Sequence, residues 1–193
     1  MAFPKSYSKK NRGDTSVKTS PRVRKDSKTE ESPRQLSPER QEQRARNVLL
    51  YQLARSAKSA HQLRQILEKR EIDAEIAEGV IQRFIEVGLI DDQLFAETIV
   101  SARRNYKGSS KSVIKRELST KGVSAEIVEE VTSEITPEDE LQTATELALR
   151  RVTRLAPLER DVRQRRLFGY LSRKGYSSNV VIAACKVAED SLR

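Results

Sequence analysis

Few residues in this chain are of the types that catalyse reactions. The sequence contains one histidine, His61, and one cysteine, Cys185. His61 lies in a polar stretch, residues 59–62, without an activated partner, so we interpret it as a surface residue in the first turn of a helix. Cys185 lies beside an apolar helical stripe, where a small buried hydrophobe is more typical than a nucleophile. These residues form no catalytic constellation, and the sequence predicts that the protein is not an enzyme.

Acidic residues and glycines are the remaining candidates for metal or phosphate chemistry. Asp91 and Asp92 are adjacent at an expected helix start, where such a pair is typical of an N-cap and a charge that complements the helix dipole. A larger acidic cluster fits a solvated face better than a metal site: Glu126, Glu129, Glu130, Glu134, Glu138, Asp139 and Glu140. The seven glycines are scattered and form no phosphate-binding loop. We therefore expect no metal and no cofactor.

Basic residues form two clusters. Residues 101–121 carry a net charge of +6 and residues 150–174 a net charge of +7. Each cluster fits either an ordinary charged surface or a contact with an anionic partner, and its recurrence favours the partner. Charge alone does not distinguish nucleic acid from an acidic protein surface. The candidate contact residues are Arg103, Arg104, Lys107, Lys111, Lys115, Arg150, Arg151, Arg154, Arg165, Arg166 and Arg173.

The segments that would position these clusters recur along the chain. Residues 63–76 match residues 114–127 after a shift of 51, and a further shift of 53 reaches Leu167, Leu171 and Lys174. Self-similarity at such a period indicates stacked supersecondary units. No stretch alternates apolar and polar residues for long enough to suggest a strand, so we predict an all-α protein. We expect nine helices in three trios: 38–56, 59–70 and 73–87; 91–106, 109–121 and 124–135; 137–155, 157–174 and 177–191.

The junctions within the trios predict a shared turn. Gly122 can adopt the left-handed conformation that ends one helix, and Ser124 can cap the next. Gly175 and Ser177 repeat this arrangement. Glu71 replaces the glycine in the first trio, at a cost of roughly 1 kcal/mol, so we expect this turn to be built differently. Each third helix carries an apolar stripe: Ile76, Val80, Ile81, Phe84 and Ile85; Ile127, Val128, Val131 and Ile135; Val180, Val181, Ala184, Val187 and Ala188.

Composition fits thin helical layers. Apolar residues make up 36% and charged residues 34% of the 193 residues. We expect three tandem three-helix repeats, 39–88, 89–136 and 137–193, that form an elongated, solenoid-like body. Residues 1–38 are rich in Ser, Lys, Arg and Pro and predict a disordered basic arm, which either solubilises the protein or attracts phosphates. With one cysteine, no signal peptide and no apolar run of ~20 residues, a cytoplasmic protein without membrane contact is expected.

A resemblance to a known family is most specific between the first two trios. The chain runs Gly88-Leu89-Ile90-Asp91-Asp92-Gln93-Leu94-Phe95-Ala96 and continues to Arg103-Arg104. This resembles the segment Gly-Leu-(Ile/Leu)-(Asp/Asn)-Asp-x-x-(Phe/Tyr)-Ala, with its trailing arginine, of the RecX regulators of the RecA recombinase. Further ordered matches extend the resemblance over roughly residues 45–190: Arg55-Ser56, Lys107-Gly108, residues 114–118, Lys121-Gly122-Val123 and residues 166–177.

The resemblance implies a fold and a function. It implies tandem three-helix repeats that form an elongated, curved, right-handed or solenoid-like body. It implies a monomeric protein of homologous recombination, DNA repair and the SOS response that docks in the groove of the RecA–single-stranded-DNA filament. It also implies that the protein lowers the ATPase, strand-exchange and coprotease activities of RecA and meets single-stranded DNA indirectly or weakly. No catalytic residue is implied. The alternatives from the residues are a sequence-independent DNA-binding protein that uses the basic arm and basic helices, and a helical hydrolase that would need a bound metal or nucleotide.

Overall fold

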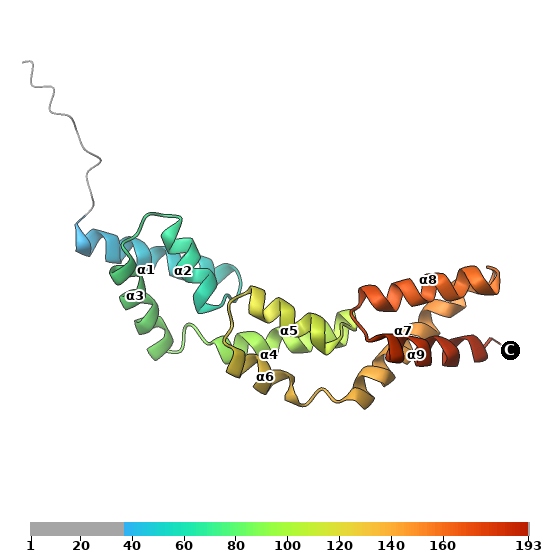
Figure 1. The fold of residues 1–193 in the computed structure, drawn as a ribbon. Coiled ribbons are helices and arrows are strands. Elements are labelled where there is room, and N and C mark those ends of the chain that lie inside the picture. Colours follow the sequence, from blue (N-terminus) through green and yellow to red (C-terminus); the bar gives the residue numbers. More distant parts are fainter. Residues whose placement is uncertain (1–36, 193) are drawn as a thin grey trace, which may run out of the picture. The chain divides into compact units, whose positions relative to one another are not determined.

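The computed structural model describes residues 37–192, which form nine α-helices and one π-helical turn without any strand (Figure 1). The first trio comprises α1 (Pro38–Arg55), α2 (Ala60–Glu68) and α3 (Ala74–Glu86). The second comprises α4 (Asp92–Ala102), α5 (Lys111–Thr120) and α6 (Ala125–Ser133), and the third α7 (Pro137–Leu155), α8 (Arg160–Arg173) and α9 (Ser178–Asp190). The predicted all-α fold of three helical trios is confirmed. The predicted basic arm lies almost wholly outside the described residues, and the predicted repeat boundaries stay predictions.

Each trio encloses its own apolar core. The first contains the fully buried Leu63, Leu67 and Ile81, and the second contains Ile114 and Leu118. The third cluster is built by α7, α8 and α9 and includes Leu167, Leu171 and Val181. One amphipathic helix cannot bury its apolar stripe alone, and each unit closes its cluster with three short helices.

The apolar stripes of the third helices are buried or half-buried, except for two exposed residues. Ile85 on α3 is 37% exposed and Val187 on α9 is 49% exposed, although both were expected in the stripe. On a helical wheel each of these residues lies at the edge of its apolar stripe, so its side chain points partly away from the buried face. Cys185 packs half-buried against the third cluster, and burial raises the pKa of its thiol to about 11. Its interpretation as a packing residue rather than a nucleophile agrees with this position.

The turn after α2 differs from the prediction. Glu71 adopts a φ of 57°, in the same left-handed region as Gly122 at 74° and Gly175 at 86°. The hydrogen bonds also match: the N–H of Ile72 donates to the carbonyl of Leu67, as that of Val123 does to the carbonyl of Leu118. The expectation of a different first turn was therefore wrong. The first trio builds the same helix-ending turn with a residue that carries a Cβ.

The helix predicted over residues 91–106 changes its hydrogen bonding within the basic cluster. α4 ends at Ala102, and the chain continues as a π-helical turn, η1 (Arg103–Lys107), which ends at Gly108 with a φ of 54°. A π-helical turn widens the helix and is frequent at functional sites. Within residues 37–192, every helix is too short or too polar to span a bilayer.

Candidate functional site

The single histidine lies where the first and second trios meet. The ring of His61 packs against Gly122, and its Nε2 lies 3.0 Å from Nε2 of Gln65. A Cβ on Gly122 would overlap this ring, so the glycine allows the second trio to approach the first. His61 lies in the first turn of α2 and is half-buried, so its predicted position holds, and the structure adds the contact with Gly122. Among the described residues, no group of three His, Cys, Asp or Glu side chains could hold a metal ion.

Acidic residues also join the trios. Asp91 caps its own helix, since its Oδ1 accepts the N–H of Leu94 at 2.8 Å. Asp92 instead reaches the preceding trio, where its Oδ1 accepts the N–H of Ala60 at 2.8 Å. Glu140 on α7 repeats the contact, because its Oε1 accepts the N–H of Lys111 at 2.8 Å. The predicted role of Asp92 in complementing its own helix is therefore incomplete: it satisfies the first turn of α2.

A second set of contacts closes each joint. The hydroxyl of Ser59 donates to the carbonyl of Lys121 at 2.5 Å, and the N–H of Ser110 donates to the carbonyl of Lys174 at 3.0 Å. A Cβ on Gly175 would lie 2.6 Å from Oγ of Ser110. Glycine is needed at both later turns because another trio packs against them. Glu71 meets no preceding trio in the described residues, which explains why a Cβ is tolerated there.

Three of the candidate contact residues in the second trio already have partners within the protein. Arg103 donates from Nε and Nη2 to the carboxylate of Glu117, at 2.6 Å each, and both side chains are about three-quarters buried. The Arg103 guanidinium lowers the pKa of Glu117 mainly through these hydrogen bonds. Lys115 pairs with Glu129 at 2.6 Å, and Nζ of Lys111 donates to the carbonyl of Ile135 at 3.1 Å. These three side chains are engaged within the second trio.

The third trio carries most of the unpaired candidates. Arg150 is exposed and only 3.9 Å from Glu146, while Arg151 lies over the ring of Tyr170 at 5.4 Å. Four further candidates are exposed and make no hydrogen bond or ion pair within residues 37–192: Arg154, Arg165, Arg166 and Arg173. The structure therefore divides the candidate set: Arg103, Lys111 and Lys115 are engaged within the second trio, whereas most candidates on α7 and α8 are available. Arg104 and Lys107 on η1 also make no side-chain hydrogen bond or ion pair with a described residue.

The π-helical turn presents an aromatic residue that sequence reasoning missed. Tyr106 is 89% exposed and stands between Arg104 and Lys107. The third trio holds this turn in place, because Lys174 donates to the carbonyl of Lys107 and the Tyr176 hydroxyl donates to the carbonyl of Gly108. An exposed ring with cationic neighbours can stack on an unpaired base. Its signal in the sequence was an aromatic residue between cations just before a glycine.

Comparison with known proteins places all three trios in one family. Family models match residues 45–84 as "RecX, first three-helix domain", residues 91–131 as "RecX, second three-helix domain" and residues 138–185 as "RecX, third three-helix domain". The chain is 40% identical over 146 residues to "Regulatory protein RecX" of Streptomyces coelicolor, covering 76% of this chain and 78% of the relative. It is 37% identical over 137 residues to the protein of the same name from Thermobifida fusca, covering 71% of this chain and 74% of the relative.

Solved structures support the fold. The crystal structure of RecX from Lactobacillus salivarius is similar with a TM-score of 0.68 at 21% identity, covering 78% of this chain and 98% of that chain. A second "Crystal structure of regulatory protein RecX" is similar with a TM-score of 0.64 at 22% identity. At these identities the likeness concerns the three-trio fold.

Proposed function

Because the chain belongs to the RecX family of regulatory proteins, we propose that it is a non-enzymatic regulator of the RecA recombinase. In this proposal the protein binds as a monomer in the groove of the RecA–single-stranded-DNA filament. Binding lowers the ATPase, strand-exchange and coprotease activities of the filament. The observation that carries the proposal beyond family membership is the group of unpaired arginines on α7 and α8.

The division of the cations supports a filament as the partner. A filament repeats the same protein surface at a fixed spacing and carries DNA phosphates beside it. Arg154 and Arg166 are free to meet an anionic surface, whereas Arg103 and Lys115 are already neutralised by Glu117 and Glu129. Several modest contacts spread over consecutive trios would add up to avidity for the polymer over a free protomer.

The test is DNA-dependent ATP hydrolysis by RecA at increasing concentrations of the full chain. We expect suppression at sub-stoichiometric amounts. A double variant, Arg154→Gln with Arg166→Gln, should need a higher concentration for half-maximal suppression and should unfold like the wild type. Arg44→Gln with Arg70→Gln is the matched control, since it removes two exposed arginines from the first trio and should leave suppression unchanged. Undiminished hydrolysis on filaments that demonstrably form would refute the proposed function.

A second candidate function is direct, sequence-independent binding of single-stranded DNA. The observation that favours it is Tyr106, exposed beside Lys107 on the π-helical turn. Direct binding predicts an affinity for bare DNA that falls steeply with salt, with a shallower slope after residues 1–38 are deleted. A filament regulator should bind the filament much more tightly than bare DNA, so the ratio of these two affinities separates the candidates.

A further inference from the structure

The second and third helices of the first two trios are joined by an ion pair at equivalent positions. Arg64 on α2 pairs with Glu78 on α3 at 2.7 Å. Lys115 on α5 pairs with Glu129 on α6 at 2.6 Å. The shift of 51 residues that relates the two trios converts one pair into the other. Both pairs lie across the outer surface where the two helices approach each other.

The third trio has apolar residues at these positions. The shift of 53 residues carries Lys115 to Phe168 on α8 and Glu129 to Ile182 on α9. Both are exposed, Phe168 by 41% and Ile182 by 59%. A salt bridge has thus been replaced by two large apolar side chains that stay in contact with solvent. The fold does not require this exchange, because the other two trios close the same place with charges.

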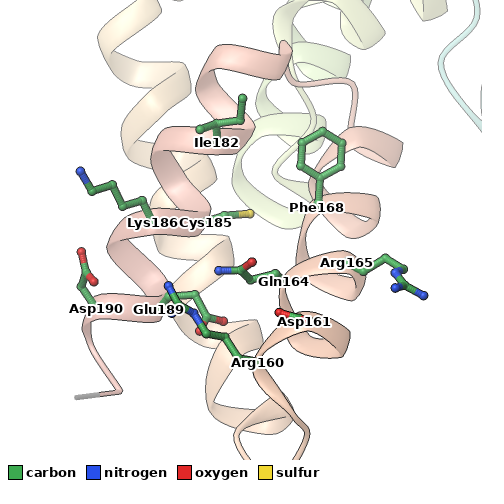
Figure 2. A pocket seen from close by; sticks show the side chains of 10 residues that line it. All are labelled: Arg160, Asp161, Gln164, Arg165, Phe168, Ile182, Cys185, Lys186, Glu189 and Asp190. Carbon is green, nitrogen blue, oxygen red and sulfur yellow. The ribbon is translucent and has the colours of Figure 1, made fainter.

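These two residues line a groove between α8 and α9, with a volume of about 570 Å³ (Figure 2). Cys185 lies on the α9 wall of this α8–α9 groove. α8 and α9 are tied elsewhere, because Arg163 donates from Nε and Nη2 to the carboxylate of Glu189 at 2.8 and 2.7 Å. That pair is nearly buried and ties the two helices at one end of the groove. Phe168 and Ile182 lie toward the other end, near the turn between α8 and α9.

Charges are arranged unevenly along the α8–α9 groove. Figure 2 shows Lys186 on α9 and Arg165 on α8 on opposite outer sides of the groove, with their side chains extending away from it. Both are exposed and make no hydrogen bond or ion pair in the part of the chain that the structure describes. Asp161 and Asp190 lie toward the other end, near Glu189. The α8–α9 groove therefore combines an apolar end with one exposed cation on each outer side.

We propose that the α8–α9 groove docks an acidic amphipathic segment on the surface of the RecA filament. A large apolar side chain of that segment enters between Phe168 and Ile182, and carboxylates beside it meet Lys186 and Arg165. This inference rests on the proposed function and assigns one of its contact surfaces. In this proposal the groove anchors the protein to recombinase protein, and Arg154 and Arg166 remain for DNA phosphates, because an apolar pocket gains nothing from a sugar–phosphate backbone.

The test replaces the apolar pair with the ion pair of the second trio. The variant Phe168→Lys with Ile182→Glu carries side chains that two trios of this chain already accommodate, so it should fold. It should raise the concentration for half-maximal ATPase suppression at least about tenfold, as loss of a central apolar contact does at interfaces. Arg64→Gln with Glu78→Gln, at the equivalent positions of the first trio, is the control and should leave the concentration unchanged. Lys186→Glu, on an exposed side chain, should weaken suppression without any effect on folding.

The single cysteine supplies a direct measure of groove occupancy. Its modification by a maleimide at mildly alkaline pH, followed by mass spectrometry of this chain, should slow when the wild type is bound to the filament. The rate should not slow for the Phe168→Lys, Ile182→Glu variant. If this variant and Lys186→Glu both suppress as the wild type does, the groove inference is overturned while the proposed function stands. A wild type that does not suppress overturns both.

Two other occupants would also overturn the inference. Protection of Cys185 that grows with protein concentration, in the absence of filament, would show a second copy of this chain in the groove. Faster modification after deletion of residues 1–36, again without filament, would show that the N-terminal segment covers it. We expect Cys185 to be protected only when the filament is present, whatever the protein concentration and with or without residues 1–36.

Discussion

Oδ1 of Asp92 accepts the backbone N–H of Ala60 at 2.8 Å, so the first helix of the second trio completes the start of a helix in the first. The contact between Glu140 and Lys111 repeats this relationship one trio later. Successive trios are thus coupled through backbone groups that each helix leaves unsatisfied in its first turn. Asp92 belongs to the sequence motif at residues 88–96, so this motif contributes to the contact between the first two trios.

Removal of this acceptor should weaken the joint. In Asp92→Ala the N–H of Ala60, a residue only 5% exposed, loses its partner, and we expect the free energy of unfolding to fall by about 1–2 kcal/mol. Asp92→Asn keeps an oxygen at this position and should restore most of the loss. Urea unfolding measures the effect, and faster hydrogen exchange in residues 60–68 locates it. Equal stability of the Ala and Asn variants would show that the acceptor does not matter.

Substitutions at two of the left-handed turns should change the free energy of unfolding in opposite directions. Gly122→Ala adds a Cβ at a φ of 74° and forces it into His61, so we expect a loss greater than the ~1 kcal/mol of the conformation itself. Glu71→Gly removes the strain of a side chain in the same left-handed conformation, at a turn that no preceding trio approaches. It should raise the free energy of unfolding by at most about 1 kcal/mol. Thermal unfolding compares the two. A loss at Gly122 no larger than ~1 kcal/mol would mean that contact with His61 does not constrain the joint.

The pair of Arg103 and Glu117 should make stability depend on acidic pH. The Arg103 guanidinium lowers the pKa of Glu117, so the folded state favours the ionised carboxylate more than the unfolded state does. The pair therefore stabilises the protein above the ordinary carboxyl pKa of ~4.3, and this stabilisation is lost as pH falls through the lower folded value. Arg103→Gln should reduce the free energy of unfolding at neutral pH. It should have little effect at a pH below the folded pKa of Glu117.

A matched pair in the first trio tests this explanation. Arg64 also lowers the pKa of Glu78, but both side chains are about half exposed, so solvent screens the interaction. Arg64→Gln should change the pH dependence of unfolding less than Arg103→Gln does. If the two variants gave the same pH profile, the burial of Arg103 and Glu117 would not be the cause.

Tyr106 should contribute to contact with single-stranded DNA. Tyr106→Ala removes an exposed ring and should weaken binding to single-stranded DNA by about 1–3 kcal/mol if a base stacks on it. Tyr106→Phe keeps the ring and should bind as the wild type does. Neither change should affect unfolding, since this side chain is 89% exposed. Fluorescence anisotropy with a labelled oligonucleotide measures the affinities, and equal binding by all three proteins would remove Tyr106 from the DNA-contact surface.

Local signals in the sequence were sufficient for the helices. Ser59, Ser110 and Ser124 accept backbone N–H groups at the starts of α2, α5 and α6, as residues of their type do. Caps, glycine turns and apolar periodicity act over a few residues, so nine helices in three trios could be predicted from them. Ser177 shows the limit, since it occupies the N-cap of α9 without a side-chain capping hydrogen bond.

The sequence by itself determined the three trios, the family and the set of cations, because helix formation and repeat spacing depend on neighbours in the chain. Only the tertiary structure decided which cations are available. Arg103 and Lys115 are neutralised by carboxylates 14 residues away, while Arg154 and Arg166 are not neutralised by any described residue. Only packing, likewise, left Phe168 and Ile182 exposed in a groove. Charge pairing and burial depend on which helix faces meet, and that is settled when the trios assemble.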